Sequence, residues 1–386
     1  MKGEPMDLDE CRARIDEIDA GLLSLFNERL DLAAAIASAK RGQGRAVFDP
    51  ARERRKLLGI AREAGPERSA QATALFSLLM SMNKAEQQRV LAAGDPASES
   101  SRARASWLPV ETPFPTAATV ACQGVEGAYS QIAACRLFAI PDITYFESFE
   151  GVFRAVRDGF SEFGVLPIEN STAGSVNAVY DLLGEYRCHI VRSLRQKIDH
   201  NLMVRPGTRL EDVREVLSHE QALAQCAGYL ERLGARPVVC ENTALAAETV
   251  AARDRADLAA LASRSAADLY GLEILDRDVQ DSDNNYTRFV VISAEPRVYP
   301  GATKTSLMLT VKHAPGALYR VLERFYALDI NLVKLESRPI PGRDFQFAFY
   351  FDLECPVGAP AFETLLDSLG DVCERFEYFG SYQEML

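Results

Sequence analysis

No stretch of this 386-residue sequence approaches the roughly 18 consecutive apolar residues that a membrane-spanning helix requires. The N-terminus, MKGEPMDLDECR, lacks the apolar core of a signal peptide. Basic residues are outnumbered, and the formal net charge of -12 argues against general nucleic-acid binding, which requires a basic face. We therefore expect a cytoplasmic protein that binds neither membrane nor nucleic acid.

Disulfide and metal-binding patterns are also missing. The eight cysteines form no CxxC pair and do not cluster as a disulfide framework, and the four histidines form no HxxxH or HExxH pair. We expect reduced cysteines that pack as small core residues. The sequence predicts no metal site and no other cofactor.

The chain is long enough for two to four domains, and 47% apolar with 25% charged residues is typical of globular proteins. Apolar residues recur at helical spacing in the first part, which predicts three helices over 7–41, 49–64 and 67–92. Residues 94–117 are rich in Ser, Pro and Ala, which indicates a linker after a helical domain over 1–93. Its Trp107, the only tryptophan, is a candidate for docking on a neighbouring domain.

Two further domains follow. Over 118–295 short apolar runs alternate with helical patterns, which predicts an α/β domain with mostly parallel strands. Over 303–386 the order strand, helix, strand, strand, helix, strand indicates an α+β ferredoxin-like βαββαβ domain. The predicted fold class is therefore multidomain, with an all-α module, an α/β domain and an α+β domain.

Polar residues at helical spacing mark the all-α module. Arg29 and Lys40 are eleven residues apart, close to three turns, so they share a face of the first helix. Asn83 and Gln87 are spaced i, i+4 on the third helix and also share a face. On an isolated helix, such a face is usually only the solvated side.

The order RxRIDEID, ERLDLAAAIASAK, DPARERR, MSMNKAEQQ resembles the helical chorismate mutases across 7–93. The resemblance implies that arginines clamp the two carboxylates of chorismate, that Lys40 and Gln87 donate to its ether oxygen, and that Glu53 accepts from its ring hydroxyl. Asn83 stands where some relatives have serine. The implied catalytic residues are Arg12, Arg29, Lys40, Asp49, Arg52, Glu53, Asn83 and Gln87.

The spacing of two of these arginines predicts an oligomer. Arg12 and Arg29 are seventeen residues apart, about 25 Å along a straight helix, so they cannot both touch one small dianion. Arg12 is expected to reach the site of a partner chain. We therefore expect a homodimer or a higher homo-oligomer.

Four polar islands follow strand ends or enter strands of the α/β domain: the turn GVEGAYS at 124–130, PIENSTAG at 167–174, Ser218-His219 with Gln221 and Gln225, and DNNYTRF at 283–289. A glycine-rich turn from strand to helix suits anion binding, although many such turns only bend the chain. A lone histidine after a strand is more often a structural hydrogen-bonding residue than a catalyst.

Together GxxGxYS, PIENS, SH and NYTRF resemble prephenate dehydratase, which implies two α/β lobes like those of periplasmic binding proteins. We expect one lobe over 118–195 with 275–295 and the other over 196–274. Thr287 is the candidate donor to the departing hydroxyl, and Arg288 either clamps a carboxylate or braces its strand. The implied catalytic residues are Thr287, Arg288 and Phe289, and the implied substrate-binding residues are Ser130, Glu169, Asn170, Ser171, Thr172, His219 and Gln225.

In the last domain, PGAL at 315–318 and ESRP at 336–339 resemble the phenylalanine-binding elements of ACT domains that are fused to dehydratases. Free amides at a helix start suit an amino-acid carboxylate, and such sites usually lie between paired ACT domains. Phenylalanine, with tyrosine as an open alternative, is expected to act as an allosteric inhibitor. The implied regulatory residues are Gly316, Ala317, Leu318, Glu336, Ser337, Arg338 and Pro339.

The leading hypothesis is a bifunctional enzyme that converts chorismate to prephenate and then to phenylpyruvate. One alternative is an amino-acid sensor with an inactive cleft, and another is a dehydratase whose inactive helical domain only dimerises. A third is arogenate in place of prephenate, because the two differ only by an amino for a keto group and these motifs do not separate them.

Overall fold

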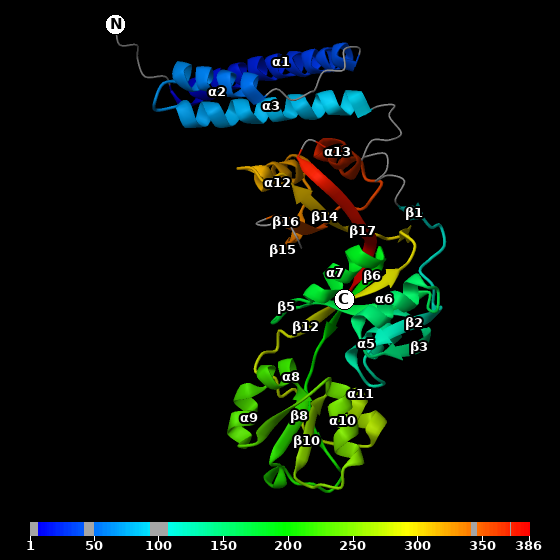
Figure 1. Cartoon of the computed structure of the whole chain (residues 1–386). Helices are drawn as coiled ribbons and strands as arrows, with labels where there is room; N and C mark the ends of the chain where they lie inside the picture. Colours follow the sequence, from blue (N-terminus) through cyan, green and yellow to red (C-terminus); the bar gives the residue numbers. More distant parts are fainter. Residues whose placement is uncertain (1–6, 42–49, 93–106, 341–345, 371) are drawn as a thin grey trace.

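The computed structural model describes residues 7–41, 50–92, 107–340, 346–370 and 372–386. Three parts are stacked along one direction, with helices at one end, an α+β domain in the middle and a two-lobed α/β domain at the other end (Figure 1). None of the helices in these ranges combines the length and apolarity needed to cross a membrane. All eight cysteines are free.

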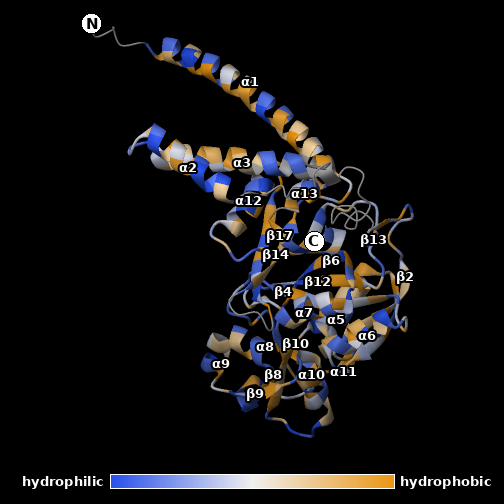
Figure 2. Ribbon diagram, turned by 45° about the horizontal axis from the view of Figure 1, so that its top comes forward, coloured by the Kyte–Doolittle hydropathy of each residue, from blue (hydrophilic) through white to orange (hydrophobic). Residues whose placement is uncertain are grey.

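The N-terminal part consists of the three predicted helices. Proline occupies the first position of the second helix, where its missing N–H costs nothing. The first helix packs on the third through its C-terminal half, where Ala33 and Ala37 are buried. Its N-terminal half diverges from the other two helices and is exposed on all sides (Figure 2). The bounds are Leu8–Arg41 for α1, Pro50–Ala64 for α2 and Ser69–Ala92 for α3.

The last part of the predicted linker, residues 107–117, has structure of its own and contacts other elements. Trp107 docks on the C-terminal domain, with ring centroids 6.0 Å from Phe362 and 5.8 Å from Tyr378. Phe114 packs between Phe138 and Phe163 in the core of the α/β domain. The short strands β1 (Leu108–Pro109) and β13 (Arg297–Val298) pair in parallel. Residues 107–117 are therefore packed against both neighbouring domains.

The first lobe is a sheet with helices on both faces. Helices α6 and α7 cover one face, where Val152, Phe153 and Leu183 are buried, and α5 covers the other. Its elements are β2 Ala117–Gln123, α5 Tyr129–Leu137, β3 Ile140–Phe146, α6 Phe149–Arg157, β4 Phe163–Asn170, β5 Gly174–Ser175, α7 Asn177–Tyr186, β6 His189–Lys197 and β12 Tyr286–Ser293.

The second lobe is formed by the chain between β6 and β12. Its sheet has the order β11-β7-β10-β8-β9, with helices on both faces. Its elements are β7 Asn201–Val204, the 3-10 helix Leu210–Asp212, β8 Glu215–His219, α8 Glu220–Gln225, α9 Ala227–Leu233, β9 Arg236–Cys240, α10 Thr243–Ala252, β10 Leu258–Ala262, α11 Arg264–Tyr270 and β11 Glu273–Asp276.

Most strands of each lobe run in one direction as predicted, but one main strand of each lobe is reversed, so both sheets are mixed. In the first lobe β12 runs antiparallel between β4 and β6, and in the second lobe β7 is antiparallel to β10 and β11. Both of these strands follow a segment that crosses between the lobes, and a returning antiparallel strand needs no crossover helix. The two crossing segments are tied together, since the Ile198 N–H donates to the Asn285 carbonyl over 2.8 Å.

The C-terminal domain has the predicted βαββαβ order, with its helices packed on one face of the sheet. Its elements are β14 Lys304–Val311, α12 Ala317–Ala327, β15 Leu332–Pro339, β16 Phe347–Leu353, α13 Pro360–Leu369 and β17 Cys373–Met385. The end of β17 pairs in parallel with β6, so the two domains share one sheet of order β15-β16-β14-β17-β6-β12-β4-β2-β3. Gly380 permits this crossing, because a Cβ there would lie 2.0 Å from the Ile190 carbonyl oxygen.

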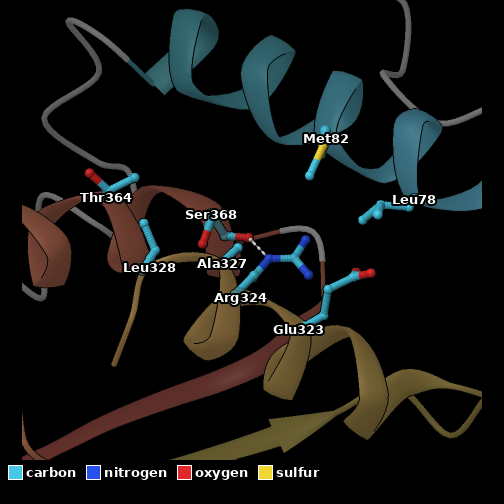
Figure 3. Close-up of a pocket in the computed structure, with 8 residues that line it drawn as sticks. All are labelled: Leu78, Met82, Glu323, Arg324, Ala327, Leu328, Thr364 and Ser368. Carbon is cyan, nitrogen blue, oxygen red and sulfur yellow. Dashed lines mark hydrogen bonds between the residues drawn. The ribbon is translucent and has the colours of Figure 1, made fainter. Parts of the chain in front are cut away.

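The helical module contacts the rest of the chain through α3. Leu78 and Met82 of α3 face the ends of α12 and α13 across a mainly apolar pocket (Figure 3). On the opposite wall, Arg324 is held by a 2.8 Å hydrogen bond from its Nε to the Ser368 carbonyl. The pocket therefore lies at an interface between two domains.

Candidate active sites

Asn170 is the centre of a buried polar cluster at the end of β4. Register places it opposite Thr287 of β12, and its Nδ2 donates to Thr287 Oγ1 and to Asn285 Oδ1, both over 3.0 Å. Its Oδ1 accepts from the backbone N–H groups of Thr172 and Ala173 over 3.0 and 2.9 Å. Such side-chain to backbone bonds hold a tight turn, which explains why asparagine suits the end of this strand.

The second lobe contributes Gln225, at the end of α8. Its Nε2 donates to Thr172 Oγ1 over 2.7 Å, and its Oε1 accepts from Asn285 Nδ2 over 2.9 Å. The ring of His200, in the first crossing segment, lies with Nε2 3.0 Å from the same Oε1. Because Gln225 offers an acceptor there, His200 is the donor through Nε2. The cluster thus joins both lobes and the segments between them.

The environment of His200 keeps its ring neutral. Burial lowers the pKa of His200, and this outweighs the opposing effects of the Gln225 hydrogen bond and the Asp199 charge. The ring packs edge-on against Tyr129, whose hydroxyl donates to the Asp199 carbonyl. His200 therefore serves the cluster as a neutral hydrogen-bond donor.

The Thr287 hydroxyl keeps a hydrogen that its bond to Asn170 does not use. Its oxygen already accepts from Asn170, so its own hydrogen is free to point toward a ligand. Ser171 braces the neighbouring backbone instead, donating to the Asn284 carbonyl over 2.7 Å and accepting from the Tyr286 N–H over 2.9 Å. The geometry brings together Asn170, Thr172, Gln225 and Thr287 among the predicted residues.

Glu169 and Arg288 lie on the opposite face of the same two strands. Arg288 is buried and forms ion pairs with Asp352 of the C-terminal domain over 2.6 Å and with Glu169 over 3.3 Å. These ion pairs fit the brace, one of the two roles predicted for Arg288, and because side chains alternate along a strand, Arg288 faces away from the cluster that Thr287 joins. Phe289 is buried in the apolar core of the first lobe.

Two other predicted residues lie outside the cluster. His219 is exposed and caps α8, where its Nδ1 accepts from the Gln221 N–H over 3.2 Å. Ser130 is buried on α5, and the turn before it approaches the second lobe, where Ser263 Oγ donates to the Gly127 carbonyl over 3.2 Å. Glycine suits this position because its φ is 86°, and a Cβ there would lie 3.3 Å from the Leu269 side chain. The turn serves contact between lobes.

His200 and Asn285 belong to the cluster but were not predicted from the sequence. Asn285 lies within DNNYTRF, so its position beside Thr287 was a usable signal. His200 has no motif around it, and its only signal is its place just before the apolar run NLMV that begins the second lobe.

The helical module brings two predicted residues, Arg29 and Asn83, into direct contact. Arg29 of α1 donates to Asn83 Oδ1 of α3 over 2.6 Å and to the Leu79 carbonyl, and burial lowers its pKa. Glu53 of α2 pairs with Lys84 over 3.2 Å, and Gln87 is buried on α3. Arg52 is exposed on α2. The Lys40 side chain and Asp49 lie outside the described residues.

Arg12 is far from this group. It lies on the exposed N-terminal half of α1 and pairs with Asp9 over 3.4 Å. Seventeen residues of helix separate it from Arg29, which is about 25 Å. Within one chain, Arg12 therefore does not reach the site that Arg29 marks.

The predicted regulatory residues occupy two elements of the C-terminal domain. Gly316 has a φ of 75° at the start of α12, with Ala317 buried and Leu318 packed on the domain core. On the edge strand β15, Glu336 accepts from Ser175 Oγ over 2.9 Å and Arg338 pairs with Asp181 over 2.7 Å. Ser337 and Pro339 are exposed on the other face.

Comparison with known families accounts for both clusters. The family model for chorismate mutase type II matches residues 11–88, and that for prephenate dehydratase matches residues 120–297. These ranges contain the Arg29 group and the Asn170 group respectively. The chain therefore combines a chorismate mutase domain with a prephenate dehydratase domain.

Individual relatives cover different shares of the chain. A bifunctional chorismate mutase/prephenate dehydratase of Enterobacter agglomerans is 31% identical over 384 residues, 96% of this chain and 94% of its own length. The chloroplastic arogenate dehydratase/prephenate dehydratase 1 of Arabidopsis thaliana is 37% identical and covers 68% of this chain and 71% of its own length. The chain belongs to the family of bifunctional chorismate mutase/prephenate dehydratases.

Two solved structures resemble about two thirds of the chain. The prephenate dehydratase of Arthrobacter aurescens in complex with L-Phe is 26% identical with a TM-score of 0.63, over 69% of this chain and 89% of that one. A protein described as GqqA, a novel type of quorum quenching acylase, is 37% identical with a TM-score of 0.64, over 68% of this chain and 97% of that one.

Proposed function

We propose that this protein rearranges chorismate to prephenate in its helical domain and converts prephenate to phenylpyruvate between the lobes of its α/β domain. The observation that carries the second activity is the buried hydrogen bond from Asn170 to Thr287, with Gln225 of the other lobe closing the cluster. The match of both domains to a bifunctional relative over 384 residues supports the combination.

The chemistry of the first step suits the helical group. The rearrangement is concerted, so the protein needs no nucleophile and no proton shuttle; it must hold the folded conformer of chorismate and balance developing negative charge. Arg29 and Arg52 supply cations for the carboxylates, and Gln87 supplies a neutral donor for the ether oxygen. Lys40 is proposed as the second donor, and Glu53 as the acceptor for the ring hydroxyl.

A second copy of the chain is proposed to complete the mutase site. The exposed half of α1 carries a stripe of apolar side chains at helical spacing, with Ile15, Ile18, Leu22 and Leu25 each about half exposed. Exposing such a stripe of apolar side chains to water is unfavourable. Because this half of α1 extends beyond its own bundle, the same helix of a second chain can pack on it. Arg12 would then enter the partner's site.

For the second step, the departing hydroxyl of prephenate needs a proton and the departing carboxylate needs a poorly hydrated site. Thr287 donates to the hydroxyl, and the amide of Asn170 that donates to Thr287 makes that proton easier to release. Closure of Gln225 and Thr172 over the substrate removes water, which favours loss of neutral CO2. Movement of the lobes about the two crossing segments admits the substrate.

The C-terminal domain is proposed to be an ACT domain that binds phenylalanine and lowers dehydratase activity. The start of α12 at Gly316 offers backbone N–H groups for a carboxylate, and Ser337 and Pro339 are exposed on the free edge of β15. An unpaired edge is also where a second copy can dock. The Arthrobacter aurescens relative in complex with L-Phe supports this choice of ligand. We also propose a cytoplasmic location, consistent with eight free thiols.

We do not propose acylase activity for this protein, despite its similarity to GqqA. Hydrolysis by a hydroxyl nucleophile needs an adjacent base. Among the described residues no histidine is hydrogen-bonded to a serine or threonine hydroxyl, since His200 bonds Gln225 and His219 caps a helix.

The deciding experiment supplies purified protein with chorismate alone and follows chorismate loss and phenylpyruvate appearance, with and without phenylalanine. We expect phenylpyruvate, and less of it when phenylalanine is added. Prephenate that accumulates would remove the dehydratase assignment. Turnover of supplied prephenate without loss of chorismate would reduce the helices to a dimerisation device, and no turnover of either would favour the sensor. A parallel assay with arogenate decides between the two dehydratase substrates.

A further inference from the structure

The paired strands β4 and β12 present polar side chains on both faces of the sheet. Register pairs Thr287 with Asn170, and one residue further along it pairs Arg288 with Glu169. Because successive side chains point to opposite faces, the first pair belongs to the dehydratase cluster and the second pair faces the C-terminal domain. The two faces are therefore linked by single peptide units on both strands.

Opposite Glu169 and Arg288, the C-terminal domain presents a second pair of oppositely charged residues. Lys334 of β15 and Asp352 of β16 are also register partners. Lys334 Nζ lies 2.8 Å from Glu169, and Asp352 lies 2.6 Å from Arg288. Two cations and two anions thus alternate around a four-charge square formed by Glu169, Arg288, Lys334 and Asp352.

The square is almost closed to solvent. The exposed fractions of the Arg288, Asp352 and Lys334 side chains are 9%, 4% and 10%, and only Glu169, at 36%, is partly open. Buried charges keep their partners because an unpaired one is costly. A shift of β15 or β16 is therefore expected to draw Arg288 and Glu169 with it.

Further bonds fix the square on both sides. Asp352 accepts from Ser306 Oγ over 2.5 Å, which ties it to β14. Lys334 also donates to Ser175 Oγ over 2.6 Å, and Ser175 lies opposite Glu169 on β5. Ser175 in turn donates to Glu336. Ion pairs and hydrogen bonds thus connect β15 to β4, the strand that carries Asn170.

We propose that the four-charge square couples the arrangement of the C-terminal domain to the positions of Thr287 and Asn170. Arg288 is then a positioning residue that acts through Thr287 and does not clamp a substrate carboxylate. This inference rests on the proposed dehydratase function and adds to it the contact through which a ligand of the C-terminal domain changes turnover. The same four residues line part of a polar cavity between the domains, and this cavity leaves room for relative movement.

The test is a double-substitution cycle on Arg288→Met and Asp352→Asn, with kcat and KM for prephenate measured in the intact protein. Arg288→Met leaves the buried Asp352 without its cation, and Asp352→Asn leaves Arg288 with Glu169 alone, 3.3 Å away, so we expect kcat to fall at least about tenfold with KM within about twofold. The double variant removes both charges, and we expect it to recover at least about a third of wild-type kcat while phenylalanine inhibition weakens about tenfold.

A matched control is Glu384→Gln, which breaks the Lys304–Glu384 ion pair in the same cavity without touching β4 or β12. This pair is about as buried as the square, so the variant tests whether loss of any ion pair in the cavity is enough, and it is expected to leave turnover and inhibition within about twofold of wild type. Lys334→Met keeps the test decisive if the buried variants unfold: we expect turnover within about threefold and inhibition weakened at least about fivefold.

Three outcomes overturn the coupling. The first is a raised KM with unchanged kcat in Arg288→Met, which would make Arg288 a substrate ligand. The second is additive loss in the double variant, and the third is full phenylalanine inhibition in Lys334→Met. Wild type that does not convert prephenate would remove the proposed function together with the coupling, whereas active wild type and unaffected variants would remove the coupling alone. If wild type converts prephenate without responding to phenylalanine, the kcat values of the Arg288 and Asp352 variants alone test the coupling.

Discussion

Replacing Thr287 with valine removes one hydroxyl and almost nothing else. The Asn170 amide would lose its 3.0 Å bond to Thr287 but keep Asn285 Oδ1 at 3.0 Å and the Tyr286 carbonyl at 3.3 Å. No buried donor is left without a partner, so the cost in unfolding free energy is about 1 kcal/mol. The loss in catalysis is much larger, because a positioned proton donor contributes about 10² to 10⁴ in rate, or about 3 to 5 kcal/mol of barrier.

The assay follows phenylpyruvate formed from supplied prephenate, and mutase turnover of the same preparation is the internal control because Arg29 and Gln87 lie in another domain. We expect Thr287→Val to lose at least about a hundredfold in kcat, and Thr287→Ser, which keeps the hydroxyl, to stay within about tenfold of wild type. Unfolding in urea measures the stability cost. If Thr287→Val retained more than a third of wild-type kcat, the assignment of Thr287 as the donor would be refuted.

Three further predictions concern other parts of the molecule. Arg29→Ala is expected to lower chorismate consumption about ten- to a hundredfold while turnover of supplied prephenate is unchanged; equal loss of both activities would contradict separate sites. Ile18→Asp with Leu22→Asp is expected to abolish mutase activity and spare dehydratase activity, and sedimentation analysis that finds an active monomer would count against the shared site. Burial lowers the pKa of His200, so the folded state resists its protonation and stability is lost as pH falls below about 6.5. Urea unfolding measured between pH 8 and pH 5 should show that the free energy of unfolding falls less in His200→Asn than in wild type. Part of the fall that remains in the variant comes from buried His189, whose pKa is also lowered.

Local periodicity was enough to predict much of the fold. Helix α1 repeats apolar residues over 34 positions, and the βαββαβ order of the last domain follows from alternating strands and two amphipathic helices. Pairings between distant strands leave no such local pattern. The contact of β17 with β6 joins residues about 190 positions apart, and nothing in either segment indicates its partner.

The candidate site shows the same division. Thr287 and Asn170 were predicted because they stand in recognisable motifs, and the structure joins them by a hydrogen bond. The same motifs contain Arg288 and Glu169, which face the other way, because a motif marks a strand and not the side to which each residue points. The partner of Arg288 is Asp352, on a strand of another domain, so its role could not be read from its neighbours in sequence.

The shared sheet also bears on how the protein folds during synthesis. The second lobe is continuous from Asn201 to Asp276, so all of its strands are available well before the chain is complete. The first lobe must wait, because one edge of β6 stays unpaired until residues 383–385 have left the ribosome. Unpaired strand edges attract other chains, and pairings between distant segments form slowly. Residues 383–385 therefore close the sheet of a domain whose first strand was made more than 250 residues earlier.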